Sequence, residues 1–341
     1  MRARRIILLV SITLSVIIAA AGYILVRVPV QHPVDSALIQ RGDLSVLFRS
    51  NAKSPQLLSG VQSILNVRQA PDFNAFDPDS PGQSGGLNLE HIFGGHRNEA
   101  NMFSPRSGRY DLFREPDGSS VTLVRHAEED PWAVSNTLTF TLREPNYVDM
   151  TFRCIAHDAG LFGSRRYAAF FFANYMNDVF VLPLYFRGLA QPGGDETWIA
   201  GDGRKQKGQP YFRGGGTYRS LNSAQLECDD DHNSPFNVWS YDWPRFTKPM
   251  YYGMMEHEMV FILMFDRMCT DTDTDEIRFA MFRSKRDYRS RPAWDFMYVI
   301  RNIEQGRDYG FRARAVWKKF ISPADCLHEY ETWKSGLLRS T

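Results

Sequence analysis

The sequence predicts an all-β protein: a large antiparallel β-sandwich between an N-terminal transmembrane helix and a C-terminal amphipathic helix. Three observations support this prediction: apolar and polar residues alternate through the middle of the chain, an uncharged apolar run lies near the N-terminus, and the last residues have helical spacing. Of the 341 residues, 43% are hydrophobic and 13% are aromatic, which is enough to build a core. The net charge of +1 gives no indication of a nucleic-acid partner.

The apolar run covers Ile6 to Val26 and follows three arginines. As a helix rising about 1.5 Å per residue, it would span the roughly 30 Å hydrocarbon core of a bilayer. Arginines that precede such a span should stay inside the cell. We therefore expect residues 1–27 to form a single-pass anchor in the cell membrane, with the rest of the chain extracytoplasmic. Three alanines at 19–21 leave a cleaved signal peptide as the alternative, in which case the domain is secreted.

Residues 28–86 are expected to be a stalk or linker, because proline recurs there and its last part is dense in Pro, Gly, Asp and Ser. The β-sandwich domain should then cover residues 87–341. Its clearest strands are 137–142 and 148–154, where strict alternation indicates one buried and one solvated face. Further strands are predicted at 110–113, 121–126, 167–173, 179–186, 259–266, 277–282, 294–301 and 309–318.

A helix is expected at residues 323–338. Ser322 suits the N-cap, Pro323 the first helical position and Asp325 the first turn. One face of this helix is apolar and should contact the sandwich; it carries Cys326, Tyr330, Trp333 and Leu337.

No metal site or cofactor is predicted. The four cysteines (154, 228, 269 and 326) form no CxxC pair, which argues against a zinc ribbon and leaves disulfides and buried thiols both open. Cys154 occupies an inward-facing strand position, which favours burial. The acidic run at 271–276 lacks the glycine and glutamate of an EF-hand loop.

The candidate catalytic residues are His257, Asp266 and Asp295. His257 stands between Glu256 and Glu258 before an apolar strand, and strand alternation would place it on the opposite face from both glutamates. On a cleft wall it could act as an acid or base near neutral pH. Two facing carboxylates could serve glycoside chemistry. The alternatives are a strand-end histidine and surface ion pairs.

Five residues are candidates for substrate binding. Trp294 beside Asp295 could provide a stacking platform for a sugar ring, and Arg267 could bind an anion or a hydroxyl group. Asn174 and Tyr175 could bind hydroxyl groups at a cleft rim, and Arg106 is a loop residue with binding potential. The alternatives are a core tryptophan and an ordinary turn.

Several segments together resemble uncharacterised, membrane-anchored bacterial proteins of the planctomycete type, related to the galactose-mutarotase-like supersandwich group. These segments are FFANYMN at 171–177, FRG at 186–188, MFDR at 264–267, PAWDF at 292–296 and YGFRAR at 309–314. The resemblance covers roughly residues 87–320 and implies two large antiparallel sheets with a concave, sugar-facing side. Epimerases of that group use a histidine and a glutamate around the sugar ring, and His257 is the nearest candidate here.

The expected function is that of an extracytoplasmic, membrane-tethered protein that binds or processes a carbohydrate. The alternative is a non-enzymatic envelope module that recognises a protein or a polysaccharide. The oligomeric state is left open.

Overall fold

The structure is a computed structural model that describes residues 32–53, 58–79, 85–96, 102–201, 216–226, 229–231, 241–269, 274–283 and 291–339. Its described part from Pro33 onward forms one compact unit. The predicted anchor, residues 1–27, lies outside the described residues. Among the described residues, no helix combines the length and the apolar character needed to cross a membrane.

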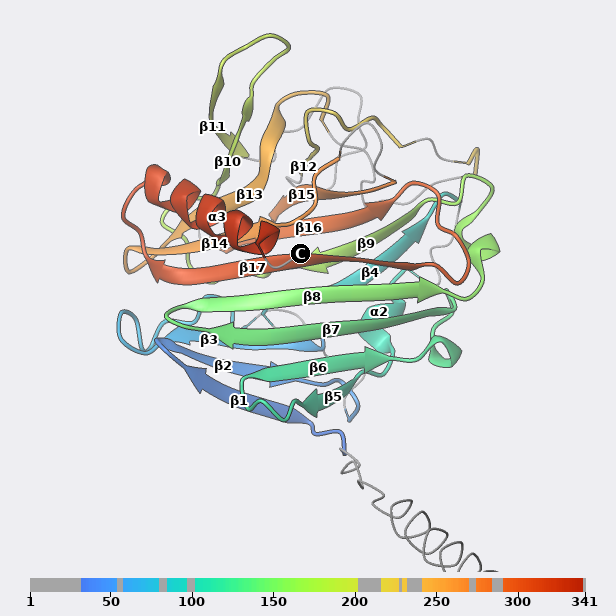
Figure 1. Cartoon of the computed structure of the whole chain (residues 1–341), viewed down its shortest axis with the longest axis horizontal. Helices are drawn as coiled ribbons and strands as arrows, with labels where there is room; N and C mark the ends of the chain where they lie inside the picture. The colour runs from blue at the N-terminus through green and yellow to red at the C-terminus, as the bar shows by residue number, and fades with distance from the viewer. Residues whose placement is uncertain are drawn as a thin grey trace, which may run out of the picture. The chain divides into compact units, whose positions relative to one another are not determined.

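Three antiparallel sheets account for the strands of the described residues (Figure 1). The three-stranded sheet has the order β1-β2-β3, with β1 Ser36–Arg41, β2 Leu44–Arg49 and β3 Gly60–Asn66. The five-stranded sheet has the order β12-β15-β16-β9-β4, with β4 Asn88–Gly94, β9 Ala168–Ala173, β12 Gly216–Tyr218, β15 Asp275–Arg283 and β16 Pro292–Ile300.

The largest sheet has nine strands in the order β11-β10-β13-β14-β17-β8-β7-β6-β5. Its strands are β5 Asp111–Arg114, β6 Ser120–Arg125, β7 Val134–Arg143, β8 Tyr147–Ala156, β10 Leu184–Leu189, β11 Glu196–Gly201, β13 Arg245–Met255, β14 Met259–Phe265 and β17 Asp308–Lys319. The helices are α2 Ser104–Ser107, η1 Ala127–Glu129, η2 Ala159–Phe162 and α3 Pro323–Leu338.

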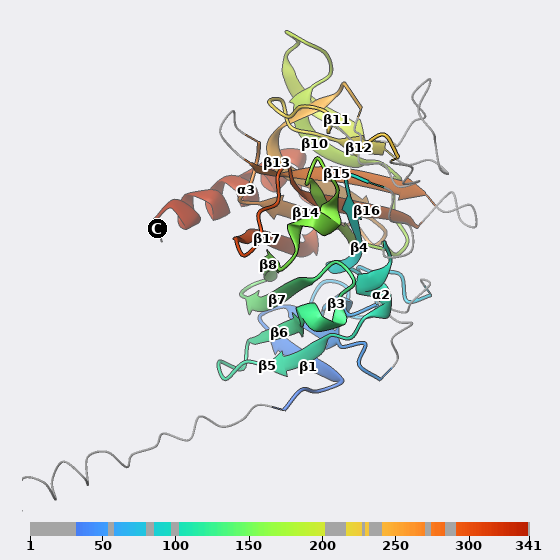
Figure 2. The ribbon, with the colours of Figure 1, turned by 90° about the vertical axis from the view of Figure 1, so that its right-hand side faces the viewer.

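The core lies between the nine-stranded and five-stranded sheets, as the prediction of a β-sandwich requires. Phe261 of β14 and Phe296 of β16 belong to one buried cluster, while their neighbours Ile262 and Met297 point to the opposite faces of their sheets. This period of two gives each sheet an inner and an outer face. Figure 2 shows the resulting layers: α3, then the nine-stranded sheet, then the five-stranded sheet.

The expected stalk, residues 28–86, is corrected by the structure, because β1, β2 and β3 lie within it. The ring centroids of Phe48 on β2 and Phe140 on β7 are 5.4 Å apart, and both side chains are fully buried. The three-stranded sheet is therefore part of the same core as the sandwich. Its strands are short and follow proline-containing segments, which obscured their alternation.

Most of the predicted strands are present, and two differences are informative. The strand expected at 179–186 begins only at Leu184, because residues 179–183 form bends and bridges. β13 was not predicted, although it has 11 residues. Pro249 and Gly253 interrupt its sequence, and both residue types weaken a strand pattern.

The C-terminal helix is confirmed at Pro323–Leu338. The Ser322 side chain accepts a 3.1 Å hydrogen bond from the backbone N–H of Asp325, as an N-cap should. Cys326, Tyr330 and Trp333 are buried against the outer face of the nine-stranded sheet. Burial of Cys154 is also confirmed, and both it and Cys326 are free thiols, whereas Cys228 lies outside the described residues.

Candidate functional site

Three of the predicted site residues, Arg106, Tyr175 and Asp295, come together on the outer face of the five-stranded sheet. Glu90 and His91, which were not predicted, complete the group. We call these five residues the Glu90 cluster. They come from β4, from α2, from the end of β9 and from β16, so four separate segments of the chain build the site.

A β-bulge places Glu90 in this position. In the pairing of β4 with β9, Leu89 lies opposite Phe172 and His91 lies opposite Phe171, so Glu90 has no partner of its own. Leu89 and Ile92 belong to the inner core. The extra residue therefore lets two consecutive side chains, Glu90 and His91, share the outer face.

Glu90 is only 3% exposed, and three groups surround its carboxylate. The Tyr175 hydroxyl donates to Oε1 at 2.7 Å, and Arg106 Nη1 lies 3.0 Å from the same oxygen. His91 Nε2 lies 3.4 Å from Oε2. Burial opposes ionisation of Glu90, but His91, Arg106 and Tyr175 together outweigh it and lower its pKa. Glu90 is therefore ionised at neutral pH.

The pKa of Asp295 is shifted in the opposite direction. Its side chain is 2% exposed, and Oδ1 accepts a 2.8 Å hydrogen bond from the backbone N–H of Asn174. Burial raises the pKa of Asp295 well above its usual value, and the negative charge of Glu90 raises it further. The environment of the cluster thus shifts the pKa values of its two carboxyl groups in opposite directions.

The surface above these carboxyl groups is aromatic and basic. The His91 ring lies 4.4 Å from the ring of Phe103 and 5.3 Å from that of Phe171, measured between centroids. Phe103 is 38% exposed, Phe171 and Tyr175 are half-buried, and the Arg106 side chain is 26% exposed. Aromatic rings beside hydrogen-bonding groups can cover the C–H face of a sugar and bind its hydroxyl groups.

Trp294 is not the stacking platform that the sequence suggested. Its side chain is fully buried in the inner core, where Nε1 donates to the Leu182 carbonyl at 3.0 Å. Alternation along β16 explains the difference, because neighbours on a strand face opposite ways and only Asp295 can face outward.

Asn174 is not a rim residue either. It is fully buried, its Oδ1 accepts from the Leu87 N–H at 2.8 Å, and its Nδ2 donates to the Trp294 carbonyl at 2.8 Å. Its side chain therefore ties two strands to the preceding loop, and its contribution to the cluster is the backbone N–H that holds Asp295.

Asp266 and Arg267 are not members of the Glu90 cluster. Asp266 follows β14 and accepts from the backbone N–H and Nε of Arg312 at 2.8 and 3.0 Å. Arg267 Nη1 lies 3.1 Å from Asp275, a buried carboxylate that also accepts from Tyr298. Among the described residues, neither Asp266 nor Arg267 forms a hydrogen bond or ion pair with Glu90 or Asp295.

His257 lies in the turn between β13 and β14, and not on a strand. His257 and Glu258 both have left-handed backbone, with φ of 57° and 56°, so strand alternation does not apply to them. The exposed His257 ring lies 4.7 Å from the Phe73 ring. Both line a surface pocket of about 300 Å³, together with Gln69, Ala70, Pro71, Asp72, Glu258 and Lys319. Neither Asp266 nor Asp295 lines it.

Comparison with known proteins gives weak matches. No protein-family model matches the chain, and no curated protein matches it. A solved GalM/aldose epimerase homologue from C. elegans is 8% identical with a TM-score of 0.43, covering 84% of this chain and 100% of that one.

Two solved lyases match over a similar part of this chain. Heparinase III is 8% identical with a TM-score of 0.39, covering 86% of this chain and 36% of that one. A heparan sulfate lyase mutant from Pedobacter heparinus is 9% identical with a TM-score of 0.32, covering 85% and 37%. The chain thus spans little more than a third of either lyase. Similarity at this level carries no functional information for this chain, and the resemblance to membrane-anchored bacterial proteins stays an expectation.

Proposed function

We propose that this chain is a carbohydrate-binding protein and that the Glu90 cluster is its sugar site. The observation that carries the proposal is the ionised Glu90 carboxylate, held by Tyr175 and Arg106 beneath a partly exposed aromatic surface. A carboxylate accepts hydrogen bonds from sugar hydroxyls, a guanidinium donates them, and the exposed ring of Phe103 covers apolar sugar surface.

A second candidate function is chemical processing of the bound sugar. The specific observation in its favour is that the two neighbouring carboxyl groups have pKa shifts in opposite directions. Such a pair assigns an acid, Asp295, and a base, Glu90, at the same pH. Both groups are almost completely buried, so both functions require a sugar that displaces part of the aromatic surface.

We propose further that residues 1–27 tether the domain to the cell membrane, with the domain extracytoplasmic. The support is the sequence itself, in which an uncharged run from Ile6 to Val26 follows three arginines. Cell fractionation tests this tether. The intact protein should sediment with membranes and resist extraction by high salt, and recovery of the intact chain in the soluble cytosol would contradict the tether.

A glycan array probed with the full chain in detergent tests the sugar site, followed by product analysis on each glycan that binds. Glu90→Gln is the informative variant, because it removes the charge and keeps the shape. We expect the wild type to bind a subset of glycans and Glu90→Gln to lose them. Absence of binding to every glycan would contradict the proposal, and binding without any product would exclude processing while leaving recognition intact.

A further inference from the structure

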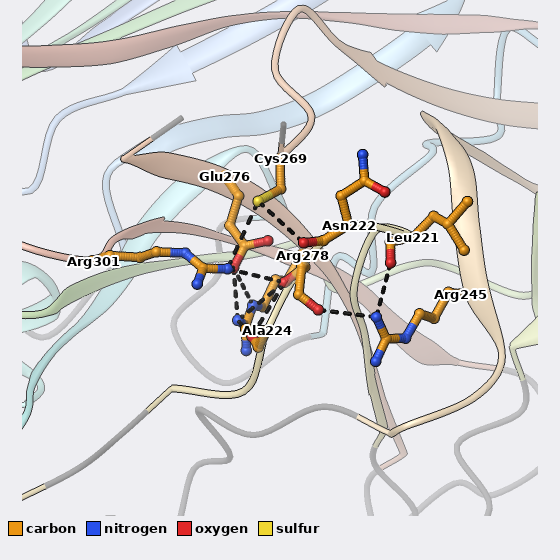
Figure 3. Close-up of polar contacts among 9 residues, drawn as sticks. Leu221, Asn222, Ala224, Arg245, Cys269, Glu276, Arg278 and Arg301 are labelled. Carbon is orange, nitrogen blue, oxygen red and sulfur yellow. Dashed lines mark hydrogen bonds and ion pairs between the residues drawn. The ribbon is translucent and has the colours of Figure 1, made fainter. Parts of the chain in front are cut away.

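A second polar group lies on the outer face of the same five-stranded sheet, and the Glu90 cluster does not include it. Four arginines form it: Arg219 after β12, Arg245 at the start of β13, Arg278 on β15 and Arg301 after β16. We call them the arginine cluster. Figure 3 shows three of these arginines around Glu276 and the chain at Leu221–Ala224.

Glu276 neutralises part of this cluster. Its Oε1 accepts from Arg278 Nε and Nη2 at 3.0 and 2.6 Å and from Arg301 Nη2 at 3.2 Å. Glu276 and Arg278 are both fully buried. One carboxylate oxygen therefore accepts from two guanidinium groups, while Glu276 Oε2 has no hydrogen-bond partner among the described residues.

Arg219 is the least satisfied member. Its residue is 2% exposed, and Nη2 lies 2.9 Å from Asp242 Oδ1. Among the described residues, the buried Nε and Nη1 have no hydrogen-bond partner. Burial, together with the positive charges of Arg245 and Arg278, lowers the pKa of Arg219 to about 10. A buried guanidinium with unsatisfied N–H groups is stabilised when an additional anion accepts hydrogen bonds from them.

Among the described residues, the carboxylates of Glu276 and Asp242 pair with this group. The partners of Arg245 Nη1 are neutral: it donates to the Leu221 and Ser223 carbonyls at 2.8 and 3.0 Å. The Asp242 side chain is 78% exposed, so the one carboxylate on Arg219 reaches it from the solvent side.

We propose that the arginine cluster binds an oxyanion at Arg219, at the position that the Asp242 carboxylate now occupies. A carboxylate or sulfate group matches the two parallel donors of a guanidinium, and Asp242 shows the direction from which such a group approaches. The arginine cluster is thus an anion-binding site of its own, distinct from the Glu90 cluster.

The two clusters begin on adjacent strands of one sheet, with Arg278 on β15 and Asp295 on β16, and Arg219 lies one strand farther away. Arg278 pairs with Met297, two residues from Asp295, and Arg278 and Asp295 both face outward. Strand geometry gives a separation of about 8 Å between their Cα atoms. Resting on the proposed function, we therefore infer that the ligand is an oligosaccharide with acidic groups, uronate carboxylates or sulfates, and not a neutral one.

Inorganic sulfate is the first probe, added to the full chain at constant ionic strength while the melting temperature is followed. Sulfate should raise the wild-type melting temperature, because a ligand that binds only the folded state stabilises it. Arg219→Met should weaken sulfate binding about tenfold or more, the effect of losing one charge-assisted contact. Asp242→Asn should strengthen sulfate binding several-fold, because it removes the competing carboxylate. Arg314→Met is the matched control, since Arg314 pairs with Asp149 on the nine-stranded sheet and should not affect sulfate.

Oligosaccharides of equal length, one neutral and one acidic, are the second probe. The wild type should bind the acidic oligosaccharide more tightly than the neutral one. Arg219→Lys keeps the positive charge but removes the paired N–H donors of the guanidinium, so it should reduce this preference. It also keeps the test available if Arg219→Met fails to fold. Equal binding of both oligosaccharides, or no sulfate effect in either the wild type or Asp242→Asn, overturns this inference and leaves the proposed function standing. Sulfate binding without binding of any oligosaccharide overturns the proposed function and leaves the anion site standing.

Discussion

The hydroxyl group of Tyr175 donates a 2.7 Å hydrogen bond to Oε1 of Glu90, across the bulge between β4 and β9. The bond links Tyr175, just beyond the end of β9, with Glu90, the one residue of β4 that has no paired residue on β9. Because the acceptor is ionised and almost fully buried, the bond is of the stronger, charge-assisted kind.

We predict that Tyr175→Phe lowers the free energy of unfolding by about 1.5–3 kcal/mol, the usual contribution of a hydrogen bond to a charged group. The pKa of Glu90 should also rise, because one of the groups that lower it is lost. Urea denaturation measures the first effect and NMR titration of the Glu90 carboxyl the second. Tyr185→Phe is the control: Tyr185 stacks on Tyr252 and its hydroxyl forms no hydrogen bond with the described residues, so removal of that hydroxyl should change stability little. Equal effects of the two substitutions would contradict the role assigned to the Tyr175 hydroxyl.

Asp295→Asn should change how stability depends on pH. Because the pKa of Asp295 is raised in the folded state, the folded protein binds this proton more tightly than the unfolded chain does. The resulting stabilisation is complete below the pKa of an unfolded aspartate and is lost as pH rises through the raised value. One proton contributes a slope of about 1.4 kcal/mol per pH unit at most.

The variant keeps the Oδ1 acceptor for the Asn174 N–H and cannot ionise, so it should become more stable than the wild type with increasing pH. Urea denaturation between pH 4 and 9 measures the difference. Parallel stability curves for the two proteins would show that Asp295 is not held protonated.

Gly253→Ala should destabilise the sandwich core. A Cβ atom at Gly253 would lie 2.1 Å from the Trp294 ring, which is fully buried. Overpacking of this kind costs about 1–3 kcal/mol. Gly336→Ala is the control, because a Cβ atom there meets nothing within 4 Å and alanine favours the helix. Thermal melts should show a decrease for the first variant and no decrease for the second.

Ser322→Ala should lower stability by about 1 kcal/mol, because the Asp325 N–H loses the acceptor that caps α3. Ser335→Ala lies within the same helix on an exposed position and should be neutral or slightly stabilising. Hydrogen exchange at the amides of the first helical turn reports on the cap directly. Unchanged exchange in Ser322→Ala would mean that the cap contributes nothing.

The sequence alone predicted the strands and the helix whose apolar residues recur at a regular spacing. β7 and β8 alternate without interruption, and α3 carries its own cap and apolar face, so each could be predicted from local residues. The three-stranded sheet was missed because its strands are short and lie in a segment rich in proline, and β13 was missed because Pro249 and Gly253 interrupt its pattern. Tertiary contacts, which a local pattern does not contain, decide such strands.

The candidate site was predictable only in part, for two physical reasons. Alternation indicates that Trp294 and Asp295 face opposite ways, but it does not say which of them faces the core. Glu90 depends on a bulge, and a bulge depends on pairing with a strand about 80 residues later, which the sequence near Glu90 does not reveal. His257 looked functional beside two glutamates, but those three residues form a turn.

Binding of one array-selected glycan to three proteins tests the central claim, that the Glu90 cluster is the sugar site, most directly. Isothermal titration should give an affinity at least about tenfold weaker for Glu90→Gln than for the wild type, the effect of losing one charged hydrogen-bond acceptor. His257→Ala, in the separate pocket, should bind as the wild type does. Wild-type affinity in Glu90→Gln, or a loss confined to His257→Ala, would contradict the claim.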